Sequence, residues 1–232
     1  EGSLFKSGKV NQKEFSAFRG FCKQRIKRSL KAHQLKAAYH HYLIGNEANF
    51  SVPGSGKTST VLAVYERLRI EKKVNTIFVI GPPSCFGPWK KEFLLTLDRH
   101  PNAHVLSGNP KTKRNYILNF SNYSQSELYL TTFQSAVNDS KEIIELFRRA
   151  DIKPFLVIDE AHYMKQVDGN RASAIISLAN YAQYRCALTG TPMPRTYKDI
   201  YNIFEFLWPK ADIIDSKTKI RIEHLEKNGR FS

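Results

Sequence analysis

Apolar and polar residues change their spacing several times along the chain, and each change marks the end of a predicted element. Phe15, Phe18, Cys22 and Ile26 recur every three or four positions, which predicts an amphipathic helix over residues 12–29. The same helical spacing predicts five further helices, around residues 35–43, 61–68, 90–97, 174–182 and 200–207.

Short apolar runs bounded by polar or turn residues predict strands between these helices. The runs are ANFSV (48–52), NTIFVIG (75–81), HVLSG (104–108), LYLTTF (128–133), FLVID (155–159) and RCALTG (185–190). Because strands alternate with helices, we expect an α/β fold whose mostly parallel sheet carries helices on both faces.

Composition is compatible with one sizeable core and with a polyanionic partner. The chain has 232 residues, 41% of them hydrophobic, and a net charge of +15. Residues 1–36 contain ten Lys or Arg and two acids, so this helical extension is strongly basic. Two interpretations stay open for it: a solvated face that braces the rest of the chain, or a surface that contacts nucleic acid.

The three cysteines and the hydropathy pattern indicate the compartment. Cys22, Cys85 and Cys186 are far apart, so neither a disulfide framework nor a zinc spacing is present. No apolar run approaches membrane length and no secretory signal opens the chain, so we expect no membrane partner and a cytoplasmic protein, or a nuclear one in a eukaryote. The sequence begins at Glu1 without Met, and we expect it to be a fragment.

The stretch SVPGSGKTST, residues 51–60, matches the phosphate-loop pattern G-x-x-x-x-G-K-[ST] except that Ser51 replaces the first glycine. Gly54 and Gly56 let successive N–H groups face one anion, and Lys57 would reach the β and γ phosphates of ATP. The hydroxyl of Thr58 would bind Mg²⁺. The strand–loop–helix context favours this interpretation over a glycine-rich turn that binds nothing. The predicted ATP-binding residues of the loop are Pro53, Gly54, Ser55, Gly56, Lys57 and Thr58.

A second motif supplies carboxylates. The apolar strand over residues 155–158 delivers Asp159 and Glu160 to its carboxyl end, where open α/β sheets bind their ligands. Asp159 would hold Mg²⁺ through water, and Glu160 would orient and deprotonate the attacking water. Two surface acids in a turn are the alternative, which the apolar strand and the GSGKT loop disfavour. The predicted catalytic residues are therefore Glu160, Asp159 and Lys57.

GSGKT, DEAH (159–162) and LTGTP (188–192), in this order, resemble motifs I, II and III of the superfamily-two helicases. PPSCFGPWKKEF (82–93), LTTFQSA (130–136) and the Lys after DEAH resemble the Snf-like (Swi/Snf-type) branch of DNA translocases. The resemblance extends from Leu30 to Pro209. It implies a basic helical extension over residues 1–30, a first RecA-like P-loop NTPase lobe over 31–210, and a charged tail over 211–232 that leads toward a second lobe.

The resemblance also implies roles for single residues. Gln34, in LKAHQ, would meet the adenine of ATP. His162, Thr189 and Thr191 would couple the γ-phosphate to the grip on nucleic acid. Contacts with the backbone of a DNA duplex would come from Ser84, Thr131, Thr132 and Lys165, although Lys165 is equally well an ordinary surface lysine. The expected ligands are ATP and Mg²⁺, and the expected partners are double-stranded DNA and the second RecA-like lobe.

Some features depart from the family pattern. Chromatin remodellers carry Asp-Glu-x-Gly-x-Gly where this chain has SVPGSG, and Pro194 and Arg195 occupy a region where the family often has Asn. We therefore expect a divergent bacterial, archaeal or viral member. No arginine-rich motif of a second lobe follows Pro209, and so the isolated chain should bind ATP weakly and hydrolyse it very slowly.

Three other functions stay open at this point. The first is a strand-separating helicase that acts on RNA or single-stranded DNA. The second is a nucleotide-gated scaffold, although the intact Glu160 disfavours it because a scaffold needs no general base. The third is a motor subunit of a restriction or defence complex, which changes the partner and leaves the chemistry the same.

Overall fold

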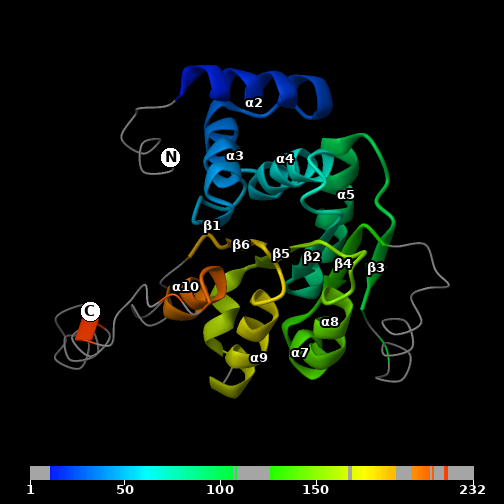
Figure 1. The fold of residues 1–232 in the computed structure, drawn as a ribbon, viewed down its shortest axis with the longest axis vertical. Helices are drawn as coiled ribbons and strands as arrows, with labels where there is room; N and C mark the ends of the chain where they lie inside the picture. The colour runs from blue at the N-terminus through cyan, green and yellow to red at the C-terminus, as the bar shows by residue number, and fades with distance from the viewer. Residues whose placement is uncertain are drawn as a thin grey trace.

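Six parallel strands form one sheet in the order β1-β6-β5-β2-β4-β3 (Figure 1). The computed structural model describes residues 11–106, 108, 126–166, 169–191, 200–209, 211 and 217–218, and for residues 165, 166 and 169–171 only their backbone. The strands are β1 (Asn46–Asn49), β2 (Thr76–Ile80), β3 (Ala103–Val105), β4 (Leu128–Thr131), β5 (Pro154–Asp159) and β6 (Tyr184–Leu188). All the strand pairs run in the same direction, so their carboxyl ends share one edge of the sheet.

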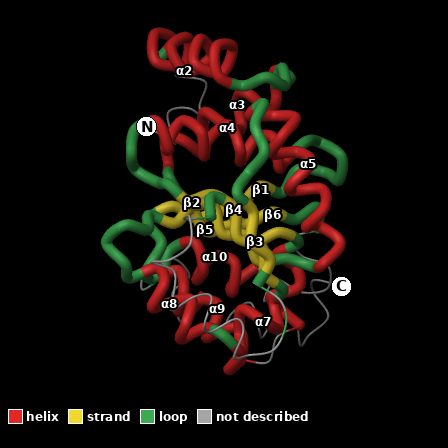
Figure 2. The backbone as a smooth tube through the Cα atoms, turned by 90° about the vertical axis from the view of Figure 1, so that its right-hand side faces the viewer, coloured by secondary structure: helices red, strands yellow, loops and turns green. Residues whose placement is uncertain are grey.

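Helices cover both faces of this sheet, as Figures 1 and 2 show, which confirms the predicted α/β class. One face carries α3 (Ala32–Ile44), α4 (Lys57–Ile70) and α5 (Phe86–Leu97), with α2 (Gln12–Arg25) outside them. The other face carries α7 (Phe133–Asn138), α8 (Ser140–Phe147), α9 (Gly169–Ala179) and α10 (Tyr201–Leu207).

The continuous apolar runs of the strands follow from burial on both sides. Ile77 and Val79 join the core under α3 to α5, whereas Phe78 and Ile80 join the core under α7 to α10. Successive side chains of a strand point to opposite faces, and so a strand covered on both faces must be apolar at every position. Strand β2 is accordingly buried throughout.

One predicted helix needed correction, and two helices were missed. The first helix ends at Arg25 rather than residue 29, because Ile26 is extended and the Lys27 N–H donates to the carbonyl of Thr96 at 2.9 Å. Helices α7 and α8 were not predicted. Helix α7 has only six residues, whereas α8 carries Ile143, Leu146 and Phe147 at a helical spacing that the prediction did not use.

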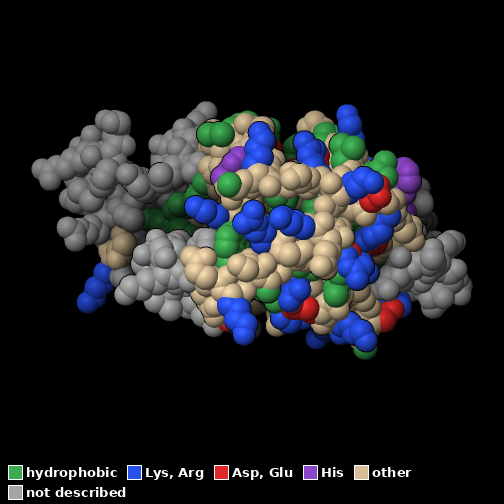
Figure 3. Space-filling view, turned by 90° about the horizontal axis from the view of Figure 1, so that it is seen from above, with side chains coloured by type: hydrophobic (Ala, Val, Ile, Leu, Met, Phe, Trp, Pro, Cys, Tyr) green, Lys and Arg blue, Asp and Glu red, His purple; other side chains and the backbone are tan. Residues whose placement is uncertain are grey.

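The basic extension is bound to the lobe through its apolar face. Phe18, Phe21 and Cys22 of α2 are buried in the same core as α3 and α4. The cations point outward, and Figure 3, which views the molecule from the side of α2, shows many Lys and Arg side chains and few acids. The extension therefore braces the lobe, and its contact with nucleic acid stays a prediction, as does a domain boundary at residue 30.

The charged tail lies almost wholly outside the described residues, as do residues 1–10. Among the helices that the structure does describe, none combines the length and the apolar character needed to cross a membrane.

Candidate nucleotide site

Three motifs that are far apart in the sequence meet at the carboxyl edge of the sheet. The loop 50–56 follows β1, Asp159 ends β5, and Thr189 follows β6, which lies between the other two strands. In register, Leu188 of β6 is opposite both Asn49 and Asp159. The Thr189 N–H also donates to the carbonyl of Asn49 at 3.2 Å. The sheet topology thus brings together the glycine loop and the carboxylates that the sequence predicts.

The glycines of the loop are required by its backbone. Gly54 and Gly56 have φ values of 77° and 82°, in the left-handed region that side chains disfavour. A Cβ atom on Gly56 would lie 2.0 Å from Nε2 of Gln34, and one on Gly190 would lie 2.8 Å from Cδ of Pro53. The loop therefore fits closely between α3 and the segment after β6, and neither neighbour leaves room for a side chain.

Gln34 supports the loop directly. Its amide nitrogen donates to the carbonyl of Ser55 at 2.8 Å, and its side-chain oxygen accepts from the Lys31 N–H at 2.8 Å. The side chain is almost completely buried. In this conformation Gln34 acts as a brace, and the adenine contact implied by the family resemblance stays a prediction.

Helix α4 presents an open amino end toward this loop. It begins at Lys57 after Gly56, and among the residues that the structure describes no side chain caps its first N–H groups. The ammonium of Lys57 donates to the loop carbonyls of Ser51 at 2.9 Å and Val52 at 3.4 Å. The hydroxyl of Ser55 is buried and lacks a hydrogen-bond partner among the described residues. Free N–H groups, a nearby cation and an unpaired hydroxyl together fit a bound phosphate.

The acidic pair is held in an unusual backbone conformation. Glu160 has a φ of 53°, which is rare for a residue with a side chain. Its N–H donates to Oδ1 of Asp159 at 3.0 Å, so the backbone fixes both residues at once. The carboxylate of Asp159 and the hydroxyl of Thr58 are hard oxygen donors of the kind that Mg²⁺ prefers. These residues fit the expected cation, and strain of this kind is common at functional sites.

The three predicted coupling residues are in contact. Nδ1 of His162 lies 3.1 Å from Oγ1 of Thr189 and 3.2 Å from Oε2 of Glu160. The Thr191 N–H donates to the same Thr189 hydroxyl at 3.1 Å. A continuous series of polar contacts thus joins Glu160, after β5, to Thr191, after β6.

The predicted nucleic-acid contacts differ in accessibility. Ser84 is exposed in the short helix η1 (Pro83–Cys85) that follows β2. The Thr132 hydroxyl instead caps α7 by accepting from the Ser135 N–H at 3.1 Å. Thr131 is fully buried, and its hydroxyl has no partner within the described part of the chain. A phosphate contact by either threonine hydroxyl would require this segment to move, and the side chain of Lys165 lies outside the described residues.

Two side chains at the site were not predicted to act there. The indole N–H of Trp89 donates to Oδ2 of Asp159 at 2.8 Å. The pKa of the Cys85 thiol is raised to about 12 by burial, and further by the charge and hydrogen bond of Asp159. Their four-residue separation was the available signal, since it places Cys85, at the N-cap of α5, one helical turn before Trp89. Trp and Cys alone suggested only packing.

The fold and the site define the class of protein: a RecA-like lobe with a glycine loop after β1 and a carboxylate pair at the end of β5. The family model described as SNF2-related domain matches residues 51–219, and the chain belongs to this family.

Curated relatives support the assignment. The chain is 29% identical to Helicase SWR1 of Mycosarcoma maydis over 68% of its length, and 27% identical to the ISWI chromatin-remodeling complex ATPase ISW2 of Saccharomyces cerevisiae over 67%. It is also 27% identical to the DNA excision repair protein ERCC-6-like of Bos taurus over 66% of its length. The matched regions span only 8%, 13% and 12% of these relatives.

A solved structure shares the fold. The Sulfolobus solfataricus SWI2/SNF2 ATPase core in complex with dsDNA aligns with a TM-score of 0.69 at 24% identity. The alignment covers 88% of this chain and 41% of that one. The chain therefore corresponds to less than half of that ATPase core.

Proposed function

We propose that this chain is the ATP-binding and DNA-contacting lobe of an ATP-dependent translocase that moves on double-stranded DNA. The observation that supports the proposal most is the series of contacts from Glu160 through His162 and Thr189 to Thr191. The residue that we propose activates water is thereby linked to a neighbouring segment at the same edge, as a nucleotide-driven motor requires.

Each polar residue at the amino end of α4 has a role in this proposal. Lys57 leaves the carbonyl of Ser51 and pairs with the β and γ phosphates, while the first N–H groups of α4 donate to them. Thr58 and Asp159 hold Mg²⁺, which neutralises charge on the phosphates when it is bound. Glu160 accepts a proton from the attacking water, and His162 keeps its carboxylate oriented.

The proposed nucleic-acid partner is duplex DNA. The related ATPase core was solved in complex with dsDNA, and this chain carries an excess of 15 positive charges. Ser84 is exposed at the carboxyl edge of β2, where its hydroxyl is free to meet a phosphate. Contacts of this kind position a motor on DNA without selecting a sequence.

A second lobe would complete the catalytic site. Arginines supplied from outside a nucleotide site raise turnover by about 10³ to 10⁵-fold in other NTPases. We therefore expect the 232-residue chain to bind ATP and to hydrolyse it far more slowly than the longer protein that contains it. Brisk hydrolysis by the purified chain alone would contradict this expectation.

The test is ATP turnover by the longer protein with duplex DNA, single-stranded DNA, RNA or no nucleic acid. The proposal predicts strong stimulation by duplex DNA that the substitution Glu160→Gln abolishes. Stimulation only by single strands or by RNA would instead indicate a strand-separating helicase. ATP binding without turnover under every condition would indicate a nucleotide-gated scaffold.

A further inference from the structure

The start of helix α5 encloses the carboxylate of Asp159. Trp89 is only 1% exposed, and its indole N–H lies 2.8 Å from Oδ2 of Asp159. The other oxygen, Oδ1, accepts the Glu160 N–H at 3.0 Å. Each carboxylate oxygen therefore has one donor that the fold holds in place.

A third donor lies one helical turn before Trp89. The Cys85 side chain hydrogen-bonds to the Asp159 carboxylate, and because a carboxylate only accepts, the thiol S–H is the donor. Packing here is tight, since a Cβ atom added to Gly81 would lie 2.9 Å from Sγ of Cys85 and 3.2 Å from Cβ of Asp159.

These contacts restrict Asp159 more than an ion pair on the surface would. A buried indole N–H without an acceptor destabilises the folded protein. Trp89 therefore favours the one orientation of the Asp159 carboxylate that accepts its hydrogen bond. In metal sites, groups that orient a ligand in this way change metal affinity by about 10- to 100-fold when they are removed.

We propose that Trp89, assisted by Cys85, is a positioning residue that fixes the Asp159 carboxylate for the metal–nucleotide complex. The inference rests on the proposed function, because it takes Asp159 as the residue that holds Mg²⁺. It gives the tryptophan of α5 a role in nucleotide binding beyond packing the core.

The test measures binding of a non-hydrolysable ATP analogue to the 232-residue chain by calorimetry, once with Mg²⁺ and once with a chelator. Trp89→Phe keeps an aromatic ring and removes the N–H, and Cys85→Ala removes the thiol donor. Trp208→Phe is the matched control, because Trp208 packs beside α10 in the other core. Thermal denaturation of each variant establishes that it is folded.

We expect the affinity measured with Mg²⁺ to fall by about tenfold in Trp89→Phe and by a smaller factor in Cys85→Ala. The affinity measured with chelator should equal that of the unaltered chain, and Trp208→Phe should match it in both titrations. A folded Trp89→Phe that binds normally with Mg²⁺, or that loses the same factor in both titrations, would overturn the inference. If Trp89→Phe does not fold, a normal Mg²⁺ titration by Cys85→Ala overturns it instead.

A different result would test the proposed function itself: the unaltered chain could bind the analogue equally well with and without Mg²⁺. That result would remove the metal role of Asp159, and with it the proposed function as well as the inference. If the inference alone is wrong, the unaltered chain still binds the analogue more tightly with Mg²⁺, and only the results for the variants differ from those expected.

Discussion

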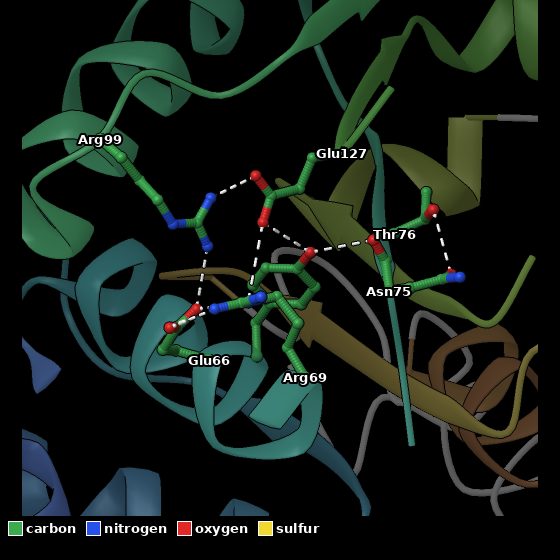
Figure 4. Close-up of polar contacts among 7 residues, drawn as sticks. Glu66, Arg69, Asn75, Thr76, Arg99 and Glu127 are labelled. Carbon is green, nitrogen blue, oxygen red and sulfur yellow. Dashed lines mark hydrogen bonds and ion pairs between the residues drawn. The ribbon is translucent and has the colours of Figure 1, made fainter. Parts of the chain in front are cut away.

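The two ends of helix α4 carry charged residues in opposite situations. At the amino end, Lys57 donates to carbonyls of its own loop, and no side chain of the described residues caps the helix. At the carboxyl end, Glu66 and Arg69 belong to a closed network with Arg99 and Glu127 (Figure 4). The charged residues at the carboxyl end of α4 are thus paired with other side chains of the chain. At the amino end, the charge is available to a ligand.

The network at the carboxyl end is extensive. Arg69 donates to both oxygens of Glu66, at 2.8 and 2.7 Å, and Arg99 donates to Glu66 at 2.9 Å and also to Glu127. Tyr65 completes it by donating to Glu127 at 3.0 Å. These contacts join α4 to the end of α5 and the start of β4. The difference between the two ends of α4 shows that the role of a charged residue cannot be inferred from its charge until its partners are known.

The largest effect should come from the carboxylate of Glu160, which follows β5 at the carboxyl edge of the sheet. Glu160→Gln in the longer protein should lower DNA-stimulated ATP turnover by about 10²- to 10⁴-fold, because an amide accepts no proton from water. Nucleotide binding should remain. Steady-state turnover measures the first effect and calorimetry the second, with the exposed Glu145→Gln of α8 as the control. Turnover close to that of the unaltered protein would remove Glu160 from the chemistry.

The next effect concerns the lysine at the amino end. Lys57→Ala should weaken nucleotide binding by about 10- to 100-fold, because a charge-assisted hydrogen bond to phosphate is lost. The free energy of unfolding should change little, since within the described residues the hydrogen bonds of the Lys57 ammonium are to its own loop. Calorimetry of the isolated chain measures the affinity, and the exposed Lys13→Ala of α2 is the control. Equal losses in the two variants would mean that general charge, rather than this site, attracts the nucleotide.

At the carboxyl end of α4 the same kind of change should affect stability instead. Arg99→Ala should lower the free energy of unfolding by about 2 kcal/mol, because it leaves Glu66 and Glu127 with fewer partners. Nucleotide affinity should not change. Urea denaturation gives the stability, and Arg149→Ala, which breaks an exposed pair with Asp151, should cost less than about 1 kcal/mol. A loss of affinity in Arg99→Ala would contradict the division between the two ends.

The smallest effect is a dependence on pH. Burial of Glu66 acts to raise its pKa, but hydrogen bonds and charges from Arg69 and Arg99 outweigh it, so the pKa is lowered from 4.5. A carboxyl group whose pKa is lower in the folded state stabilises the protein at pH values above its pKa in the unfolded state. That stabilisation is lost as the pH falls through the pKa of the folded state. The free energy of unfolding should therefore decline below about pH 4.5, and less steeply in Glu66→Gln. Urea denaturation at a series of pH values measures this. If the free energy of unfolding falls equally steeply with pH in both proteins, Glu66 is not a source of the pH dependence.

The sequence predicted the amino end of α4 better than the carboxyl end, for a physical reason. The loop at Gly54 to Thr58 needs particular residues at a particular spacing, so its chemistry appears locally in the sequence. The network joins Glu66 to Arg99 and Glu127, which lie 33 and 61 positions further along the chain. No local pattern in the sequence indicates that pairing.

The same distinction explains what was missed within the site. Asp159 and Glu160 follow an apolar strand and were predicted, whereas the bond from Trp89 to Asp159 spans 70 positions. The strands were predicted because burial on both faces requires continuous apolar runs. Helix α7 was missed because it is short and begins after Thr132, whose capping role depends on a backbone turn. Helix α8 was missed although Ile143, Leu146 and Phe147 recur at helical spacing.

The most direct test of the account is a crystal structure of this chain with Mg²⁺ and a non-hydrolysable ATP analogue. We predict that the phosphates lie over the first turn of α4, that Lys57 has left the carbonyl of Ser51 for them, and that Mg²⁺ lies between Thr58 and Asp159. An analogue bound elsewhere, or bound at this loop while Lys57 still contacts Ser51, would contradict the claim that the amino end of α4 is a nucleotide site.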